Sequence, residues 1–135
     1  MTPRRAPDGM GLSGTLLVVD DDPQIHQMLK MFFRSKGLQV VTAGSGEEAL
    51  AALHCRPVLI LLDVNMPGMD GVATLKQIKA RHATLPVVIM SGGGDEAAAR
   101  EALASGAYDY VTKPFNLEYL ETVVMTKVLL GIEDV

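Results

Sequence analysis

The sequence predicts an α/β protein whose parallel β-sheet is covered by helices on both faces. Three observations lead to this prediction. Short apolar runs alternate five times with longer segments whose apolar residues recur at helical spacing. The most apolar of these runs, residues 58–62, has no polar residue at all, which is typical of a strand buried on both faces of a sheet. Finally, the alternation of strand and helix along the chain is the pattern of parallel βα units.

Chain length and composition predict one packed domain. The 135 residues fit a single domain, and 48% of them are apolar. Residues 1–13 are rich in Pro, Gly and Ser and are expected to be a mobile tail, residues 14–131 the domain, and residues 132–135 a C-terminal stub. Whether the chain acts alone or was part of a longer protein stays open.

Charge and cysteine content exclude several classes of function. The net charge of −4 argues against direct binding of nucleic acid, which usually requires a cluster of basic residues. The single cysteine, Cys55, cannot form an internal disulfide, which favours a reducing compartment. No apolar run approaches the length of a membrane span, and the N-terminal stretch has no signal-peptide core. We therefore expect a cytoplasmic protein without a membrane anchor.

The first half of the chain contains three of the expected strands and two of the helices. The strands are predicted at residues 15–19, 38–42 and 58–62. Asp22 can cap the first helix, Pro23 suits its first turn, and Gly37 ends it. Its inward stripe is expected to be Ile25, Met28, Leu29 and Phe32. A second helix is expected to begin at Ser45 or Gly46, with two glutamates in its first turn that favour the helix dipole.

The second half contains the remaining two strands and three helices. A loop over residues 63–71 precedes a helix that runs to about Arg81, with Val72, Leu75 and Ile78 facing inward. Strands are predicted at residues 86–90 and 108–112, and an alanine-rich helix at 95–104 between them. The last helix is expected to begin near Asn116 and to run to about Leu130.

The residues directly after the strands contain the candidate chemistry. Asp20 to Asp22 follow the first strand, Asp63 the third, Ser91 the fourth, and Lys113 with Pro114 the fifth. Since ligands of such sheets bind at the carboxyl ends of the strands, we expect these groups to converge at one edge. The three histidines, His26, His54 and His82, have no partners in common and are expected at the surface.

A convergence of carboxylates, a lysine and a serine hydroxyl favours phosphoryl chemistry with Mg²⁺. Several nearby carboxylates repel one another, and oxygen ligands without Cys or His suit Mg²⁺ better than zinc. Mg²⁺ retains waters, which leaves room for a phosphate oxygen, while the ammonium and the hydroxyl can hold two others. An ionised carboxylate beside the metal is a competent nucleophile toward phosphorus.

Four strings at the strand ends resemble the receiver domains of response regulators in two-component signalling. The strings are Val18-Val19-Asp20-Asp21, Leu62-Asp63-Val64-Asn65-Met66-Pro67-Gly68-Met69-Asp70-Gly71, Met90-Ser91-Gly92 and Tyr110-Val111-Thr112-Lys113-Pro114-Phe115. The resemblance covers about residues 14–130. It implies the flavodoxin-like, doubly wound fold with five parallel strands in the order 2-1-3-4-5 and five helices.

The resemblance also implies a role for each of these residues. Asp63 would be the phosphoacceptor, and Asp20, Asp21, Asp63 and the backbone carbonyl of Asn65 would bind Mg²⁺. Lys113 and Ser91 would contact the phosphoryl group, Tyr110 would be the switch aromatic, and Lys113–Pro114 would be a cis peptide bond. The donor would be a histidine kinase or a phosphotransfer protein.

The last helix is more apolar than a helix with one buried face requires. Leu117, Leu120, Val124 and Val128 form the expected inward stripe. Other apolar residues lie largely off this stripe, and they include Tyr119, Val123, Met125 and Leu129. Exposed apolar surface often marks a partner site. We therefore expect the fifth strand and last helix to form a face for a homodimer or an effector protein.

Two alternatives to a phosphoryl-accepting switch compete with this interpretation. A phosphatase with an aspartate nucleophile commonly has a second acid two residues later, whereas this chain has Asn65. A degenerate receiver that only binds proteins is the other alternative. The complete set of Asp20, Asp21, Asp63, Ser91 and Lys113 argues against it.

Overall fold

The computed structural model describes residues 14–66, 70–94 and 96–133. The proposed tail, residues 1–13, and the end of the proposed stub, residues 134–135, lie outside the described residues. The strands are β1 (Thr15–Val19), β2 (Gln39–Ala43), β3 (Leu59–Asp63), β4 (Val87–Ser91) and β5 (Asp109–Thr112). The helices are α1 (Pro23–Arg34), α2 (Gly46–Ala51), the 3₁₀ turn η1 (Ala52–Cys55), α3 (Gly71–Arg81), α4 (Glu96–Ala104) and α5 (Leu117–Glu133).

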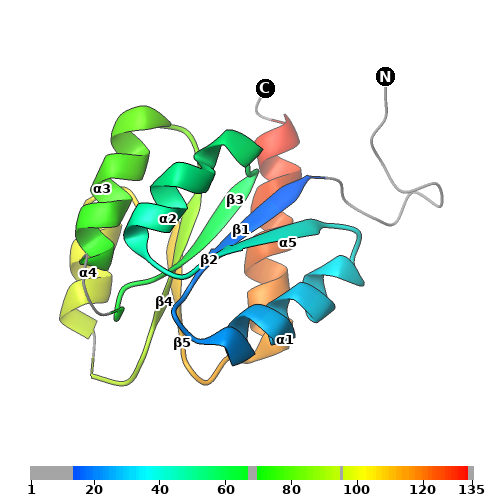
Figure 1. Ribbon diagram of the computed structural model, residues 1–135, viewed down its shortest axis with the longest axis horizontal. Coiled ribbons are helices and arrows are strands. Elements are labelled where there is room, and N and C mark those ends of the chain that lie inside the picture. Colours follow the sequence, from blue (N-terminus) through cyan, green and yellow to red (C-terminus); the bar gives the residue numbers. More distant parts are fainter. Residues whose placement is uncertain (1–13, 67–69, 95, 134–135) are drawn as a thin grey trace.

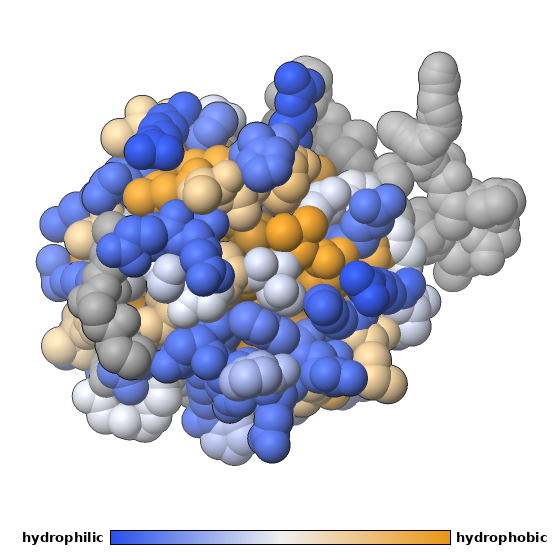
Figure 2. All heavy atoms as spheres, in the orientation of Figure 1, coloured by the Kyte–Doolittle hydropathy of each residue, from blue (hydrophilic) through white to orange (hydrophobic). Residues whose placement is uncertain are grey.

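The five strands form one parallel sheet in the order β2-β1-β3-β4-β5, which confirms the expected doubly wound fold. Helices α1 and α5 pack on one face of the sheet, and α2, α3 and α4 on the other (Figure 1). Hydrophilic side chains cover most of the surface in Figure 2, and apolar atoms are visible between the helices of the two layers. No helix in the described ranges is long and apolar enough to cross a bilayer.

Alternation along the strands divides the core into two clusters. Leu16 and Val18 face α1 and α5, whereas Leu17 and Val19 face α2 and α3. All five residues of β3 are buried, as expected for the central strand of a sheet covered on both faces. This arrangement explains why the strands read as continuous apolar runs.

Side-chain caps fix where three of the helices begin. The Asp22 carboxylate accepts from the Gln24 N–H at 2.9 Å, which confirms the predicted cap of α1. Ser45 accepts from the Glu48 N–H at 3.1 Å at the start of α2. Asp70 accepts from the Val72 N–H at 2.9 Å at the start of α3. Asp22 and Ser45 lie two or three residues after the ends of β1 and β2, so the loops into α1 and α2 are short.

Gly71, the first residue of α3, touches the end of β3. A Cβ built on Gly71 would lie 2.4 Å from the Val64 Cα and 3.0 Å from the Asp63 carbonyl oxygen. Backbone packed this closely leaves no room for a side chain. The glycine therefore permits α3 to start directly against the strand that ends in Asp63.

Several predicted boundaries and faces were wrong by a small amount. Strand β3 includes Asp63, and β4 includes Ser91, because their backbones continue the parallel ladder past the last apolar side chain. In α1, Phe33 is fully buried although the predicted stripe did not include it. Helix α5 continues to Glu133, two residues into the proposed stub.

The prediction that Val123 lies on an exposed face was also wrong. Val123 is only 7% exposed and belongs to the core between α5 and the sheet. Met125 is half-buried against the same core, whereas Tyr119 and Leu129 are exposed as expected. The buried face of α5 is wider than a single stripe, because residues three and four positions apart both turn toward the sheet.

Candidate functional site

The strand-end groups converge at the carboxyl edge of the sheet, as the sequence predicted. Asp20 directly follows β1, Asp63 is the last residue of β3, and Ser91 is the last residue of β4. Lys113 directly follows β5. Asp63 therefore lies on the central strand, with the acid of β1 on one side and the hydroxyl and ammonium of β4 and β5 on the other.

Three carboxylates form a cluster suited to a divalent cation. Asp20, Asp21 and Asp63 each offer one carboxylate oxygen, and these atoms lie within 4.8 Å of one another. Asp20 and Asp63 are buried and Asp21 is exposed, so the cluster opens to solvent on one side. Hard oxygen donors with an open side fit Mg²⁺, which keeps several of its waters. The donor set therefore fits the metal that the sequence predicted.

Lys113 bridges the two buried carboxylates. Its Nζ lies 2.7 Å from the Asp20 Oδ2 and 3.2 Å from the Asp63 Oδ2. The Lys113 N–H donates to the Ser91 carbonyl at 2.8 Å, which ties the end of β5 to β4. The Lys113–Pro114 peptide bond is cis. The ion pair of Lys113 with Asp20 is the shorter of the two.

The backbone fixes the rotation of both buried carboxylates. The Asp20 Oδ1 accepts from the Asp22 N–H at 2.9 Å, and the Asp63 Oδ1 accepts from the Asn65 N–H at 2.9 Å. Each carboxylate thus has one oxygen bonded to its own loop and the other to Lys113. Preorganised groups of this kind need little rearrangement when a new charge arrives.

The environment of Asp63 disfavours its ionised form. Burial raises the pKa of Asp63 above its ordinary value, and the nearby Asp20 charge raises it further. The hydrogen bond from the Asn65 N–H and the charge of Lys113 act in the opposite direction but do not outweigh burial. For Lys113, burial lowers the pKa, but the contacts with Asp20 and Asp63 outweigh it, so the pKa of Lys113 is raised.

The raised pKa of Asp63 predicts that Asp63→Asn stabilises the protein at neutral pH without Mg²⁺. Above the folded-state pKa the buried charge opposes folding. As the pH falls through that pKa, the folded form takes up the proton before the unfolded form does, and stability rises. The difference in free energy of unfolding between variant and wild type should therefore be largest near pH 7 and shrink toward the ordinary pKa of 3.8. Urea unfolding of both proteins at several pH values measures it, and a difference independent of pH would contradict the prediction.

Ser91, Tyr110 and Asn65 lie around the cluster, but their roles remain predictions. Ser91 is buried at the end of β4, and its main-chain carbonyl accepts from the Lys113 N–H. Tyr110 is half-buried and packs against the core on the α3 and α4 side. Asn65 is exposed, and its N–H donates to the Asp63 carboxylate.

One contact at the site was missed by the sequence reasoning. His26, which was expected to be a surface residue, is half-buried, and its Nε2 lies 2.5 Å from the Asp20 main-chain oxygen. The spacing offers one signal in retrospect, since His26 lies one helical turn after the Asp22 cap. One turn of α1 brings its ring back over Asp20, two residues before the cap.

Comparison with known proteins gives the same fold. The family model of the response regulator receiver domain matches residues 16–125. The DNA-binding transcriptional regulator NtrC of Salmonella typhimurium is 47% identical over 106 residues, which is 78% of this chain and 23% of that protein. The probable transcriptional regulatory protein TcrX of Mycobacterium tuberculosis is 38% identical over 86% of this chain and 49% of its own length. The chain thus spans about a quarter of the length of NtrC.

Solved structures of response regulators have the same fold. NtrX from Brucella abortus in complex with ADP superposes with a TM-score of 0.85 at 35% identity, over 91% of this chain and 29% of that one. A putative response regulator from Chloroflexus aurantiacus superposes with a TM-score of 0.79 at 35% identity, over 87% of this chain and 98% of that one. The strand order defines a flavodoxin-like α/β domain with its site at the carboxyl ends of the strands. The chain belongs to the response regulator receiver family.

Proposed function

We propose that Asp63 accepts a phosphoryl group in a Mg²⁺-dependent reaction and that this modification switches the β4–α4–β5–α5 face. The observation that carries the proposal is the Asp63 carboxylate, which lies in a cluster with two further acids and 3.2 Å from the Lys113 ammonium. Positioning and charge neutralisation are the main requirements of in-line phosphoryl transfer, and this cluster supplies both.

The phosphoryl donor would be a phosphohistidine on a histidine kinase or a phosphotransfer protein. A carboxylate oxygen of Asp63 attacks phosphorus, a P–O bond forms, and the P–N bond breaks with its electron pair going to the imidazole. Asp20, Asp21, Asp63 and the Asn65 carbonyl would hold Mg²⁺, which supplies charge neutralisation at the phosphoryl oxygens. Such a reaction would place the protein in the cytoplasm together with its phosphoryl donor.

Phosphorylation changes the charge that the neighbouring groups experience. The phosphoryl group adds a charge of roughly −1.5 to −2 beside Lys113 and Ser91. Lys113 would exchange its contact with Asp63 for one with a phosphoryl oxygen, and the Ser91 hydroxyl would donate to another. Because the Lys113 N–H is bonded to the Ser91 carbonyl, β4 and β5 would respond together. Tyr110, on β5, would change its orientation in the same step.

Intact-mass analysis after incubation with acetyl phosphate tests the acceptor. Wild type with Mg²⁺ should gain about 80 Da, one phosphoryl group, and neither wild type without Mg²⁺ nor Asp63→Asn should gain it. Asp70→Asn is a matched control, because Asp70 is an exposed acid that caps α3, and it should be phosphorylated like wild type. Equal labelling of Asp63→Asn and wild type would exclude Asp63 as the acceptor.

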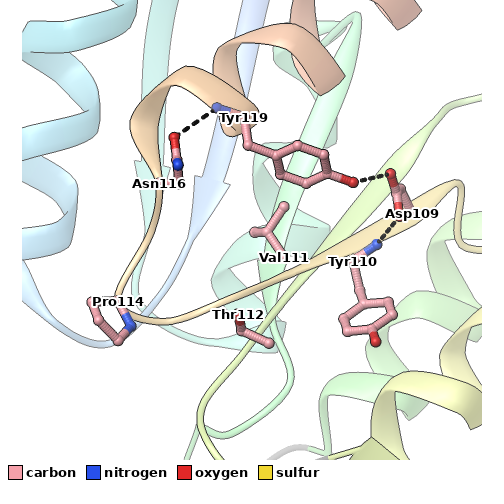
Figure 3. Close-up of a pocket in the computed structure, with 7 residues that line it drawn as sticks. All are labelled: Asp109, Tyr110, Val111, Thr112, Pro114, Asn116 and Tyr119. Atoms are coloured by element: carbon pink, nitrogen blue, oxygen red, sulfur yellow. Dashed lines mark hydrogen bonds between the residues drawn. The ribbon is translucent and has the colours of Figure 1, made fainter.

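Exposed apolar residues support a partner face at the β5 edge of the sheet, the edge near Lys113. The large apolar residues that the described part of the chain exposes are Met31, Leu103, Tyr108, Tyr119 and Leu129. All but Met31 lie on α4, α5 or the approach to β5. Of these residues, Tyr119 also lines a surface pocket of about 550 Å³ that extends along β5 and the start of α5. Figure 3 shows Tyr119 pointing toward Asp109, to which its hydroxyl donates at 3.2 Å, and Tyr110 pointing to the other side of β5.

A double substitution tests whether this face binds a partner, either a second copy or an effector protein. We expect wild type to self-associate at high micromolar concentration when the phosphoryl mimic beryllofluoride is added, and Tyr119→Ser with Leu129→Ser to weaken that association about tenfold. Met31→Ser removes a still more exposed apolar residue, on α1, and should have no effect. Sedimentation equilibrium measures both. A wild type that stays monomeric would exclude the homodimer and leave the effector as the partner to be sought.

A further inference from the structure

His26 connects helix α1 to the loop that carries two of the three clustered acids. The residue lies in the first turns of α1, and its Nε2 is 2.5 Å from the main-chain oxygen of Asp20. A ring nitrogen that carries a proton donates to this carbonyl, which requires the proton on Nε2. The side chain is half-buried, so water competes only partly for the same carbonyl.

The contact completes the set of hydrogen bonds around Asp20. The Asp20 N–H donates to the Ala43 carbonyl at 3.0 Å, and its carboxylate accepts from the Asp22 N–H and from Lys113. Asp20 is fully buried, and within the described residues its carbonyl has no other partner than His26. A buried carbonyl that loses its hydrogen-bond partner destabilises the conformation that buries it. Of the four contacts, only that of His26 comes from a side chain of α1.

We propose that His26 is a positioning residue that holds the Asp20–Asp21 segment in the geometry that binds the cation. The inference rests on the proposed function, since it assumes that the three acids hold Mg²⁺. His26 is not itself one of the candidate metal ligands, and it acts on them through its contact with the Asp20 backbone carbonyl. When that carbonyl is fixed, the peptide that joins Asp20 to Asp21 cannot rotate, and both carboxylates stay aimed toward Asp63.

To hold the Asp20 carbonyl, the side chain at position 26 must offer one N–H donor at the right distance from the α1 backbone. The imidazole supplies the donor on a stiff ring with two rotatable bonds, so little freedom is lost when the bond forms. A glutamine side chain offers an N–H at a similar reach from the backbone, whereas alanine offers none. Contacts that orient metal ligands in this way typically contribute about 10–100-fold to metal affinity.

Calorimetric titration of the whole chain with Mg²⁺ at fixed pH tests the inference. We expect His26→Ala to raise the Mg²⁺ dissociation constant about tenfold and His26→Gln to stay within about twofold of wild type. His54→Ala is the matched control, because His54 also contacts a main-chain carbonyl, that of Ala51 at 2.8 Å, but lies at the end of η1. It should bind Mg²⁺ like wild type.

A second readout separates this inference from the proposed function. Amide hydrogen exchange of Asp22, whose N–H donates to Asp20, should become about tenfold faster in His26→Ala and stay slow in His26→Gln. If His26→Ala binds Mg²⁺ as tightly as wild type, or if His26→Gln is as weak as His26→Ala, the role of His26 is wrong and the metal site stands. A wild type that binds no Mg²⁺ overturns the metal site and this role with it.

Discussion

Replacing Lys113 with methionine should lower the free energy of unfolding by about 3 kcal/mol at pH 7 without Mg²⁺. Lys113 is the cation bonded to both buried carboxylates, with its Nζ 2.7 Å from Asp20 and 3.2 Å from Asp63. Methionine keeps most of the side-chain volume but removes the charge. Two like charges then remain in a site with little access to water, and part of the cost is their mutual repulsion.

Urea unfolding measures this loss, and two further variants test its cause. Lys76→Met removes an exposed pair, since Lys76 lies 3.7 Å from Glu101 with both side chains more than half exposed, and it should change stability by less than about 0.5 kcal/mol. Adding Asp20→Asn to Lys113→Met should restore part of the lost stability, because the repulsion between the two buried carboxylates is then removed and only the Asp63 charge remains. A Lys113→Met protein as stable as Lys76→Met would show that the buried acids do not depend on the lysine.

Replacing Gly71 with alanine should also destabilise the fold, by about 3 kcal/mol or more. The new Cβ would lie 2.4 Å from the Val64 Cα. Because the atom it meets is backbone rather than the end of a flexible side chain, either α3 or the end of β3 must move. Asp63 precedes Val64, so the same shift should displace the proposed phosphoacceptor and slow its labelling by acetyl phosphate.

Gly93 provides the control for this substitution. A Cβ on Gly93 would meet nothing within 4 Å, so Gly93→Ala should change the unfolding free energy by less than about 1 kcal/mol. Thermal unfolding monitored by circular dichroism compares the two variants directly. If Gly71→Ala melts at the temperature of Gly93→Ala, α3 can move away from β3 at little cost, and the close contact is not a constraint.

The fold could be predicted from sequence because its strands are buried on both faces. A continuous apolar run such as residues 58–62 is typical of a strand in this position, and capping residues such as Asp22 mark where the helices begin. The strand ends were less accurate, because the backbone ladder includes Asp63 and Ser91 after the apolar run has ended. Side-chain polarity indicates burial, whereas strand bounds follow backbone pairing.

The candidate site was predictable where one rule of topology applied. Asp20, Asp63 and Lys113 converge because the carboxyl ends of parallel strands share one edge. Contacts that depend on the orientation of a helix followed no such rule. His26 reaches Asp20, and Val123 turns into the core, because of how α1 and α5 rotate as they pack on the sheet. Sequence spacing alone does not determine that rotation.

Because β3 is the central strand of the sheet, Asp63 has different groups on its two sides. Asp63 ends a strand that is paired on both sides, so its backbone has little freedom to move. On the β2 side, β1 is followed by acids and the edge strand β2 ends in Ala43. On the β5 side, Ser91 ends β4 and Lys113 follows β5, and both side chains can contact a phosphoryl oxygen. If Asp63 is phosphorylated as proposed, we therefore expect the resulting displacement to be transmitted toward β5 rather than toward β2. A reporter group attached beside β5 should detect the state of Asp63, while the same group attached beside β2 should remain silent.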